Sequence, residues 1–156
     1  MTTHISYSEL KEWHNCAWKH KLVYLDKIKQ FMGNEHTSFG TALHTVCENL
    51  VLEKITVDEG KDVFLREFLN ELKHLKEKDA SFELNKQLVL DMKEQGQHLV
   101  QYVLPALKSY FGKFQLISVE EKLYELHNRE KEYNFKGFVD LVIQTKDGKY
   151  HVVDWK

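Results

Sequence analysis

Two aspartates and a lysine near the end of the chain have the types and spacing of a metal-dependent hydrolytic site. Asp140 lies in the apolar run FVDLVI, and Asp154 and Lys156 lie in the run HVVDWK. Because side chains alternate along a strand, Asp154 and Lys156 would share one face while Trp155 points to the other. Facing carboxylates repel each other unless a cation lies between them, and oxygen ligands suit divalent cations. Such an ion activates water and a lysine stabilises developing charge, so these residues predict phosphodiester hydrolysis.

The turn between these runs decides whether the two aspartates converge. A two-residue turn would place Asp140 opposite Trp155, on the wrong face for a shared site. A three-residue loop, Lys146-Asp147-Gly148, would place Asp140 opposite Asp154, and its last position favours a left-handed residue. Since that last position is a glycine, we predict the three-residue loop with a positive φ at Gly148.

A surface ion pair is the simplest alternative for Asp-x-Lys, because any exposed strand face can carry one. Gly137-x-x-Asp140, at hairpin distance before it, makes that alternative less attractive. Almost all the remaining residues of the runs around both aspartates are apolar. Such continuous runs predict strands buried on both faces. Unpartnered aspartates would be costly there, so the sequence favours a site that gives them a partner.

A histidine upstream can supply a third ligand. His44 lies in an expected apolar helix, with Gly40 one turn before it and Glu48 one turn after it. A glycine on the same helical face lets a backbone or a ligand approach closely. An imidazole that joins two carboxylates would suit manganese better than a site made only of oxygens. Because the chain has nine histidines, a packed or surface imidazole is the alternative.

The elements that must position these residues are helices first and strands afterwards. Hydrophobic periodicity and capping residues predict helices over 6–25 with a break at Asn15-Cys16, 39–53 capped by Thr37 or Ser38, 58–78 capped by Asp58, and 82–110. Pro105 should kink or restart the last helix, and Gly112 should end it. Strands are predicted over 115–126, 135–144 and 150–155. This succession predicts an α/β class with an α+β-like order.

Composition bounds the class of protein. A chain of 156 residues with 42% hydrophobic and 29% charged residues suits one domain with a single core. The net charge of −2 argues against a passive nucleic-acid coat protein but allows a local basic groove. The chain opens on polar residues, has no apolar run of membrane-spanning length, and has too few cysteines for a disulfide framework. We therefore expect a cytoplasmic protein with no membrane partner.

Four short motifs, taken in order, resemble those of a known nuclease family. They are Gly40-x-x-x-His44, Glu120, Gly137-x-x-Asp140 and Asp154-x-Lys156. Together they resemble the PD-(D/E)XK nuclease superfamily, in its RecB-like exonuclease branch, over nearly the whole chain. The opening stretch SYSELKEWHNCAWKHKLVY is also similar to that branch, although Ala17 stands where proline is usual.

The resemblance implies a role for each matched residue. The implied ligands of Mg²⁺ or Mn²⁺ are His44, Asp140, Asp154 and the main-chain carbonyl of Trp155. Lys156 would be the catalytic lysine and Glu120 an accessory carboxylate, with Glu121 as a competitor that strand alternation does not exclude. An iron–sulfur cluster is not supported, because relatives that hold one use three further late cysteines. Cys16 and Cys47 are instead expected to be packed thiols.

The resemblance also implies a fold and an activity. N-terminal helices would pack on a small mixed sheet with a β-meander, as a restriction-endonuclease-like core. Residues 1–156 would be a single domain that is incomplete at its C-terminus, because the family's next strand and its Gln-x-x-x-Tyr helix do not follow. The implied enzyme is a Mg/Mn-dependent DNA exonuclease of recombination, repair or phage DNA processing, in a bacterial or phage-infected cell, with a helicase or recombination protein as partner.

Two alternatives to an enzyme stay open. One is a non-catalytic nucleic-acid-binding or interaction module on the same fold, and the other is a helical adaptor whose acidic hairpin is only surface. The basic region with Lys19, Lys21 and Lys27, together with its aromatic neighbours, could contact phosphates and stack on bases. The competing interpretation of that region is a solvated amphipathic helix with aromatic core residues.

Overall fold

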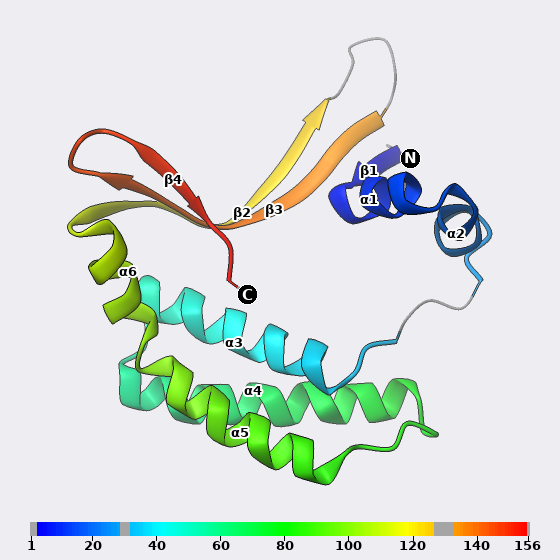
Figure 1. The fold of residues 1–156 in the computed structure, drawn as a ribbon, viewed down its shortest axis with the longest axis horizontal. Helices are drawn as coiled ribbons and strands as arrows, with labels where there is room; N and C mark the ends of the chain where they lie inside the picture. Colours follow the sequence, from blue (N-terminus) through cyan, green and yellow to red (C-terminus); the bar gives the residue numbers. More distant parts are fainter. Residues whose placement is uncertain (1–2, 29–31, 127–132, 156) are drawn as a thin grey trace. The chain divides into compact units, whose positions relative to one another are not determined.

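The computed structural model describes residues 3–28, 32–126 and 133–155 (Figure 1). Within them the chain forms six α-helices, one π-helical turn and a four-stranded sheet. The elements are β1 Thr3–Ser6, α1 Tyr7–Asn15, α2 Ala17–His20, the π-helix η1 Lys21–Leu25, α3 Glu35–Val51, α4 Val57–Lys78, α5 Lys86–Val100, α6 Val103–Phe111, β2 Phe114–Leu126, β3 Tyr133–Thr145 and β4 Tyr150–Val153. This architecture confirms the predicted mixed α/β class.

The chain divides into two compact units. One comprises Met1–Phe31 and Glu120–Val139, and the other comprises Met32–Val119 and Asp140–Lys156. Strands β2 and β3 both continue through the points of division. The second unit contains α3 to α6 and the β3–β4 hairpin, which are the elements that carry the predicted histidine and aspartates.

In the first unit, α1 begins where the sequence predicts. The Ser6 hydroxyl accepts a hydrogen bond from the backbone N–H of Glu9 at 3.2 Å and caps α1. Cys16 is extended, which separates α1 from α2 as predicted, and its Sγ accepts from the N–H of Lys19 at 3.4 Å. Cys16 is exposed, so the expectation of a packed thiol is wrong here. The Cys16 sulfur caps the start of α2, at the exposed junction between α1 and α2, and is not packed in a hydrophobic core.

The sequence does not predict β1. Its four residues pair in parallel with β3, from Thr3 opposite Tyr133 to Ser6 opposite Lys136. The strand has only four residues, and the last of them, Ser6, is also the cap of α1. Because so short a segment shows no clear alternation, the strand is defined by its long-range pairing. Since β3 also pairs with β2 and runs antiparallel to β4, the sheet is small and mixed, as expected.

In the second unit, α3, α4 and α5 share one hydrophobic core. Phe64 and Phe68 of α4 are fully buried and stack with ring centroids 5.7 Å apart, and Phe39 of α3 meets Phe64 edge-on at 5.4 Å. Helix α5 approaches this cluster through Gly96, where an added Cβ would lie 2.0 Å from Cζ of Phe64. The glycine therefore sets how closely α5 packs on α4.

Helix α3 begins four residues before the predicted start. Asn34 is its cap, because the Asn34 side chain accepts from the N–H of Thr37 at 3.0 Å and the Thr37 hydroxyl accepts from the N–H of Asn34 at 2.8 Å. The prediction of Thr37 or Ser38 as the cap is thus wrong. Thr37 is the third helical residue, and it completes a reciprocal capping box.

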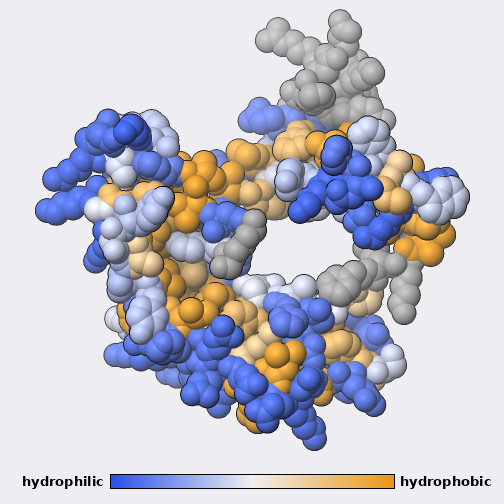
Figure 2. Space-filling view, viewed as in Figure 1, coloured by the Kyte–Doolittle hydropathy of each residue, from blue (hydrophilic) through white to orange (hydrophobic). Residues whose placement is uncertain are grey.

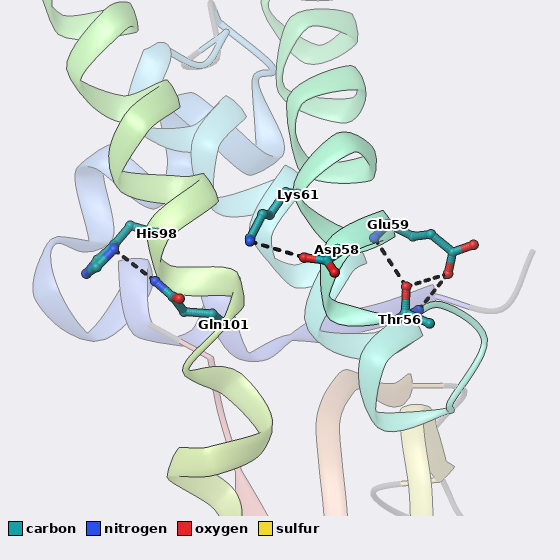
Figure 3. Close-up of polar contacts among 6 residues, drawn as sticks. All are labelled: Thr56, Asp58, Glu59, Lys61, His98 and Gln101. Carbon is teal, nitrogen blue, oxygen red and sulfur yellow. Dashed lines mark hydrogen bonds and ion pairs between the residues drawn. The ribbon is translucent and has the colours of Figure 1, made fainter.

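Helix α4 is also capped earlier than predicted, by two residues. Thr56, not Asp58, is its cap, and the Glu59 carboxylate accepts from the N–H of Thr56 at 2.7 Å (Figure 3). Asp58 instead lies in the first turn and forms a surface ion pair with Lys61 at 3.3 Å. The hydrogen bonds that the Glu59 carboxylate accepts from the N–H and the hydroxyl of Thr56 lower the pKa of Glu59.

The predicted long helix over 82–110 is two helices. Helix α5 ends at Val100, near a hydrogen bond between the side chains of His98 and Gln101 at 2.9 Å (Figure 3), and α6 restarts at Val103. Pro105 is therefore the third residue of α6, in the first turn, where its missing N–H breaks no helical bond. The predicted restart is confirmed.

Helix α6 packs on the strands and forms a second core. Leu107 of α6 meets Leu141 and Ile143 of β3, which are fully buried. The other face of the hairpin is open, since Val152 is 71% exposed and Tyr150 is 66% exposed. The prediction that both faces of these strands are buried is wrong, because within the described residues α6 covers only the face of the odd-numbered positions of β3.

Candidate metal centre

The β3–β4 hairpin has the predicted register. The N–H of Gly148 donates to the carbonyl of Thr145 at 2.9 Å, and the N–H of Thr145 donates to the carbonyl of Lys149 at 2.9 Å. Gly148 has φ +82°, which confirms the three-residue loop with a left-handed last residue. The pairs run from Gln144 opposite Tyr150 to Leu141 opposite Val153. Continued by one residue, this register sets Asp140 opposite Asp154.

The chain leaves the strand immediately after Val153. The N–H of Trp155 donates to Oδ2 of Asp140 at 2.9 Å, so a side chain replaces the backbone acceptor that a continued strand would offer. The prediction that β4 extends to Trp155 is therefore wrong. The Asp140 side chain is only 12% exposed, and this backbone donor gives it a hydrogen-bond partner.

His44 reaches the same place from α3. Its Nδ1 lies 3.5 Å from Oδ2 of Asp140, and its Nε2 lies 2.8 Å from the carbonyl oxygen of Trp155. Because a carbonyl can only accept, we assign the proton to Nε2. In the neutral imidazole Nδ1 is then an acceptor near a carboxylate oxygen, and a proton or a metal cation between the two would satisfy both. The Trp155 carbonyl, implied as a metal ligand, is used here by His44.

Glu120 lies at the point where β2 passes from one unit to the other, and its role as an accessory carboxylate stays a prediction. Glu120 has φ +52°, a left-handed conformation that non-glycine residues rarely adopt, and its neighbour Glu121 is exposed. The positive φ breaks the alternation of β2, which is why the sequence does not decide between the two glutamates.

An imidazole nitrogen and a carboxylate oxygen are suitable ligands for a divalent cation. Oxygen donors suit Mg²⁺ and Mn²⁺, and the nitrogen shifts the preference towards transition metals such as manganese. His44 and Asp140 can therefore contribute ligands to a divalent metal.

Asp154 and Lys156 are the two remaining predicted site residues. Asp154 follows β4 and is exposed. It lines a neighbouring cavity of about 480 Å³ together with Trp155. Lys156, the predicted catalytic lysine, lies outside the described residues. Both assignments stay predictions from the sequence.

The predicted nucleic-acid-binding lysines all lie in the first unit. Lys19 is paired with Glu12 at 2.9 Å, and Lys21 is paired with Asp26. Lys27 is exposed and has φ +52°. The two ion pairs neutralise part of the positive charge of this basic region. The role of these lysines in binding nucleic acid stays a prediction.

Cys47 of α3 lies close to the candidate centre but differs from it chemically. It is buried, as predicted, with 2% of its surface exposed. Burial raises the pKa of its thiol to about 12, and the negative charges of Asp140 and Glu48 add to the effect. Because the thiol stays protonated at neutral pH, it is neither a nucleophile nor a thiolate ligand.

Comparison with known proteins identifies the family. A family model of the PD-(D/E)XK nuclease superfamily matches residues 4–156, while no curated protein and no solved structure matches the chain. The six helices and small mixed sheet are consistent with the restriction-endonuclease-like fold of that superfamily. Within the described residues, no helix is both long and apolar enough to cross a bilayer. The chain belongs to the PD-(D/E)XK nuclease superfamily.

Proposed function

We propose that this protein is a metal-dependent nuclease that hydrolyses DNA phosphodiester bonds. The family supports both the nuclease activity and the use of a divalent metal. The observation that carries the proposal is the meeting of His44 and Asp140 at the main chain of Trp155. A helix and a hairpin that are distant in sequence thereby bring a nitrogen and an oxygen ligand to one point.

In this proposal His44, Asp140 and Glu120 hold the metal, with Asp154 as a further ligand. When bound, the ion would lower the pKa of a water molecule and polarise a phosphoryl oxygen. The hydrogen bond from Trp155 fixes the position of the Asp140 carboxylate. Lys156 would orient the attacking water or stabilise the negative charge that develops on the phosphate.

We further assign the protein to the RecB-like exonucleases, on the motifs from Gly40 to Lys156. The imidazole in the ligand set favours manganese as the activating ion, with magnesium as the alternative. A role in recombination, repair or phage DNA processing, with a helicase or recombination protein as partner, follows from that branch. The 156 residues would act as one nuclease domain, and Lys19, Lys21 and Lys27 would contact the DNA backbone.

A cleavage assay on the whole chain tests the proposal. Linear and circular DNA are incubated with Mn²⁺, Mg²⁺ or EDTA, and products are resolved by gel electrophoresis. We expect metal-dependent cleavage that His44→Ala and Asp140→Ala abolish, and degradation of linear DNA alone would support an exonuclease. Asp58→Ala is the matched control, because that carboxylate is exposed on α4 and should be dispensable.

Two results would contradict the proposal. Cleavage that continues in EDTA would exclude metal dependence, and wild-type rates in Asp140→Ala would remove this group from the reaction. DNA binding without cleavage under any metal condition would instead favour the non-catalytic binding module on the same fold.

A further inference from the structure

A groove at the tip of the β3–β4 hairpin carries lysines that the metal centre does not use. One cavity there, of about 430 Å³, is lined by Tyr110, Phe111, Lys113, Lys146, Lys149 and His151, among other residues. A second cavity, of about 390 Å³, adjoins it and shares Lys113 and Lys146. We call these two adjoining cavities the tip groove.

The tip groove concentrates positive charge on a chain whose net charge is −2. Lys113, Lys146 and Lys149 are all exposed, and hydrophilic side chains gather at this tip, at the left of Figure 2. The one acidic residue that lines it, Asp147, is paired with Lys149 at 2.7 Å. Three lysines against one aspartate leave an excess of two positive charges, which suits a polyanion.

Aromatic rings form one wall of the tip groove. Tyr110, in the last turn of α6, is 84% exposed. Its ring centroid lies 4.8 Å from that of Phe111, and the Phe111 centroid lies 5.1 Å from that of His151. A tyrosine ring that is open to solvent and supported by further rings offers a surface on which a planar base can stack.

We propose that the tip groove binds single-stranded nucleic acid, with its lysines on the phosphates and Tyr110 stacked on a base. Lysines combined with exposed aromatic rings are the two elements that single-strand binding needs. A duplex offers the same phosphates, but its bases are already stacked on each other. The choice of a single strand therefore depends on the ring of Tyr110.

The proposal rests on the proposed nuclease function and deepens it. Tyr110 and Phe111 also line the cavity that contains Asp154 and Trp155 at the end of β4. A strand held in the tip groove could therefore continue past these rings towards Trp155, where His44 and Asp140 meet. The tip groove would hold the substrate strand at a distance from the bond that is cut.

Binding of an oligothymidylate of about 16 nucleotides by the whole chain tests this proposal. Fluorescence anisotropy is followed in EDTA, over a series of salt concentrations. Removing two phosphate contacts in Lys113→Ala/Lys146→Ala should reduce the slope of log K against log salt by about 1.4, because each single-strand contact contributes about 0.7. The control Lys73→Ala/Lys93→Ala removes two exposed lysines from α4 and α5 and should leave the slope unchanged.

The stacking contact is tested separately. Tyr110→Ala should weaken binding about fivefold or more, whereas Tyr110→Phe keeps a ring and should retain the affinity. An unchanged slope in the lysine variant, or equal affinity of Tyr110→Ala and the wild type, would overturn the proposal. Displacement by polyglutamate as effective as displacement by unlabelled oligothymidylate would overturn it as well, in favour of an acidic protein partner.

The two proposals can fail independently. Since the binding titration contains EDTA, absence of cleavage would not change its outcome. Equally, the effect of Asp140→Ala on metal-dependent cleavage does not depend on what occupies the tip groove.

Discussion

Asp140 should contribute to stability and to metal binding in ways that two substitutions separate. Its Oδ2 accepts a hydrogen bond from the N–H of Trp155 at 2.9 Å and lies 3.5 Å from Nδ1 of His44. Asp140→Ala removes both the acceptor and the charge. Asp140→Asn removes the charge but keeps an oxygen acceptor of similar size, so a comparison of the two isolates each role.

The structure sets the size of the first effect. A hydrogen bond to a charged group contributes about 1.5–3 kcal/mol, and one between neutral groups about 0.5–1.5 kcal/mol. Because the Asp140 side chain is only 12% exposed, water replaces the lost acceptor poorly. In EDTA we expect Asp140→Ala to lower the free energy of unfolding by about 2 kcal/mol. Asp140→Asn should lower it by less than about 1 kcal/mol, since it keeps an oxygen acceptor for this hydrogen bond.

Manganese reveals the second effect. At ten times its dissociation constant, an ion that binds only the folded state adds about 1.4 kcal/mol to the free energy of unfolding. We expect this gain in the wild type and not in Asp140→Asn. Urea denaturation followed by tryptophan fluorescence, with EDTA or Mn²⁺, measures both effects. Equal stabilisation of the wild type and Asp140→Asn by manganese would refute the ligand role, and a fully stable Asp140→Ala in EDTA would refute the structural one.

Five further substitutions, in three sets, test the packing, the backbone conformation and the titration of the chain. Gly96→Ala should lose about 1–3 kcal/mol of stability, because the added Cβ would lie 2.0 Å from a buried phenylalanine ring. Gly40→Ala should gain up to about 1 kcal/mol, because an added Cβ meets nothing within 4 Å there. Equal melting temperatures of the two variants would contradict this. Glu120→Gly should gain about 1 kcal/mol of stability, because glycine adopts the left-handed conformation of this position without strain. Glu121→Gly should lose about 0.5–1 kcal/mol. Urea denaturation that shows the reverse order of stability would contradict this prediction. The pKa of Cys47 is raised from 9.0 to about 12, so the folded state keeps a proton that the unfolded state loses. Stability should fall between these pH values by up to about 1.4 kcal/mol per pH unit in the wild type but not in Cys47→Ala, and parallel pH profiles would contradict this.

The hairpin register could be predicted because local chemistry determines it. A glycine at the third loop position favours the left-handed conformation that the three-residue loop needs, and Gly148 adopts it. Helix positions could likewise be predicted from periodicity, although their first residues could not. Asn34 caps α3 five residues before the predicted start at residue 39, so local preference alone left the boundary open.

Features that depend on contacts between distant residues could not be predicted. The short β1 exists only through pairing with β3. Glu120 has a backbone conformation that breaks strand alternation, so the pattern of β2 does not distinguish Glu120 from Glu121. The end of β4 at Val153 follows from a side-chain acceptor on Asp140, which no pattern in the sequence indicates. In each case the free energy comes from a tertiary contact that overrides local preference.

Hydrophobicity misled the prediction in one respect. The apolar runs of β3 and β4 predict burial on both faces, yet Val152 of β4 is 71% exposed. Apolar side chains commonly remain on protein surfaces, so composition alone does not reveal which face a partner covers. Spacing and family resemblance suggested the candidate site residues, whereas the contact of His44 with the Trp155 carbonyl required the structure.

The central claim is that His44 and Asp140 hold a divalent metal, and locating the metal tests it most directly. Crystals of the protein soaked in MnCl₂ would be measured at the manganese absorption edge, and the anomalous difference map would show where the ion binds. We predict one dominant peak within coordinating distance of Nδ1 of His44 and a carboxylate oxygen of Asp140. A manganese peak only at other carboxylates, with His44 and Asp140 uncoordinated, would contradict the account.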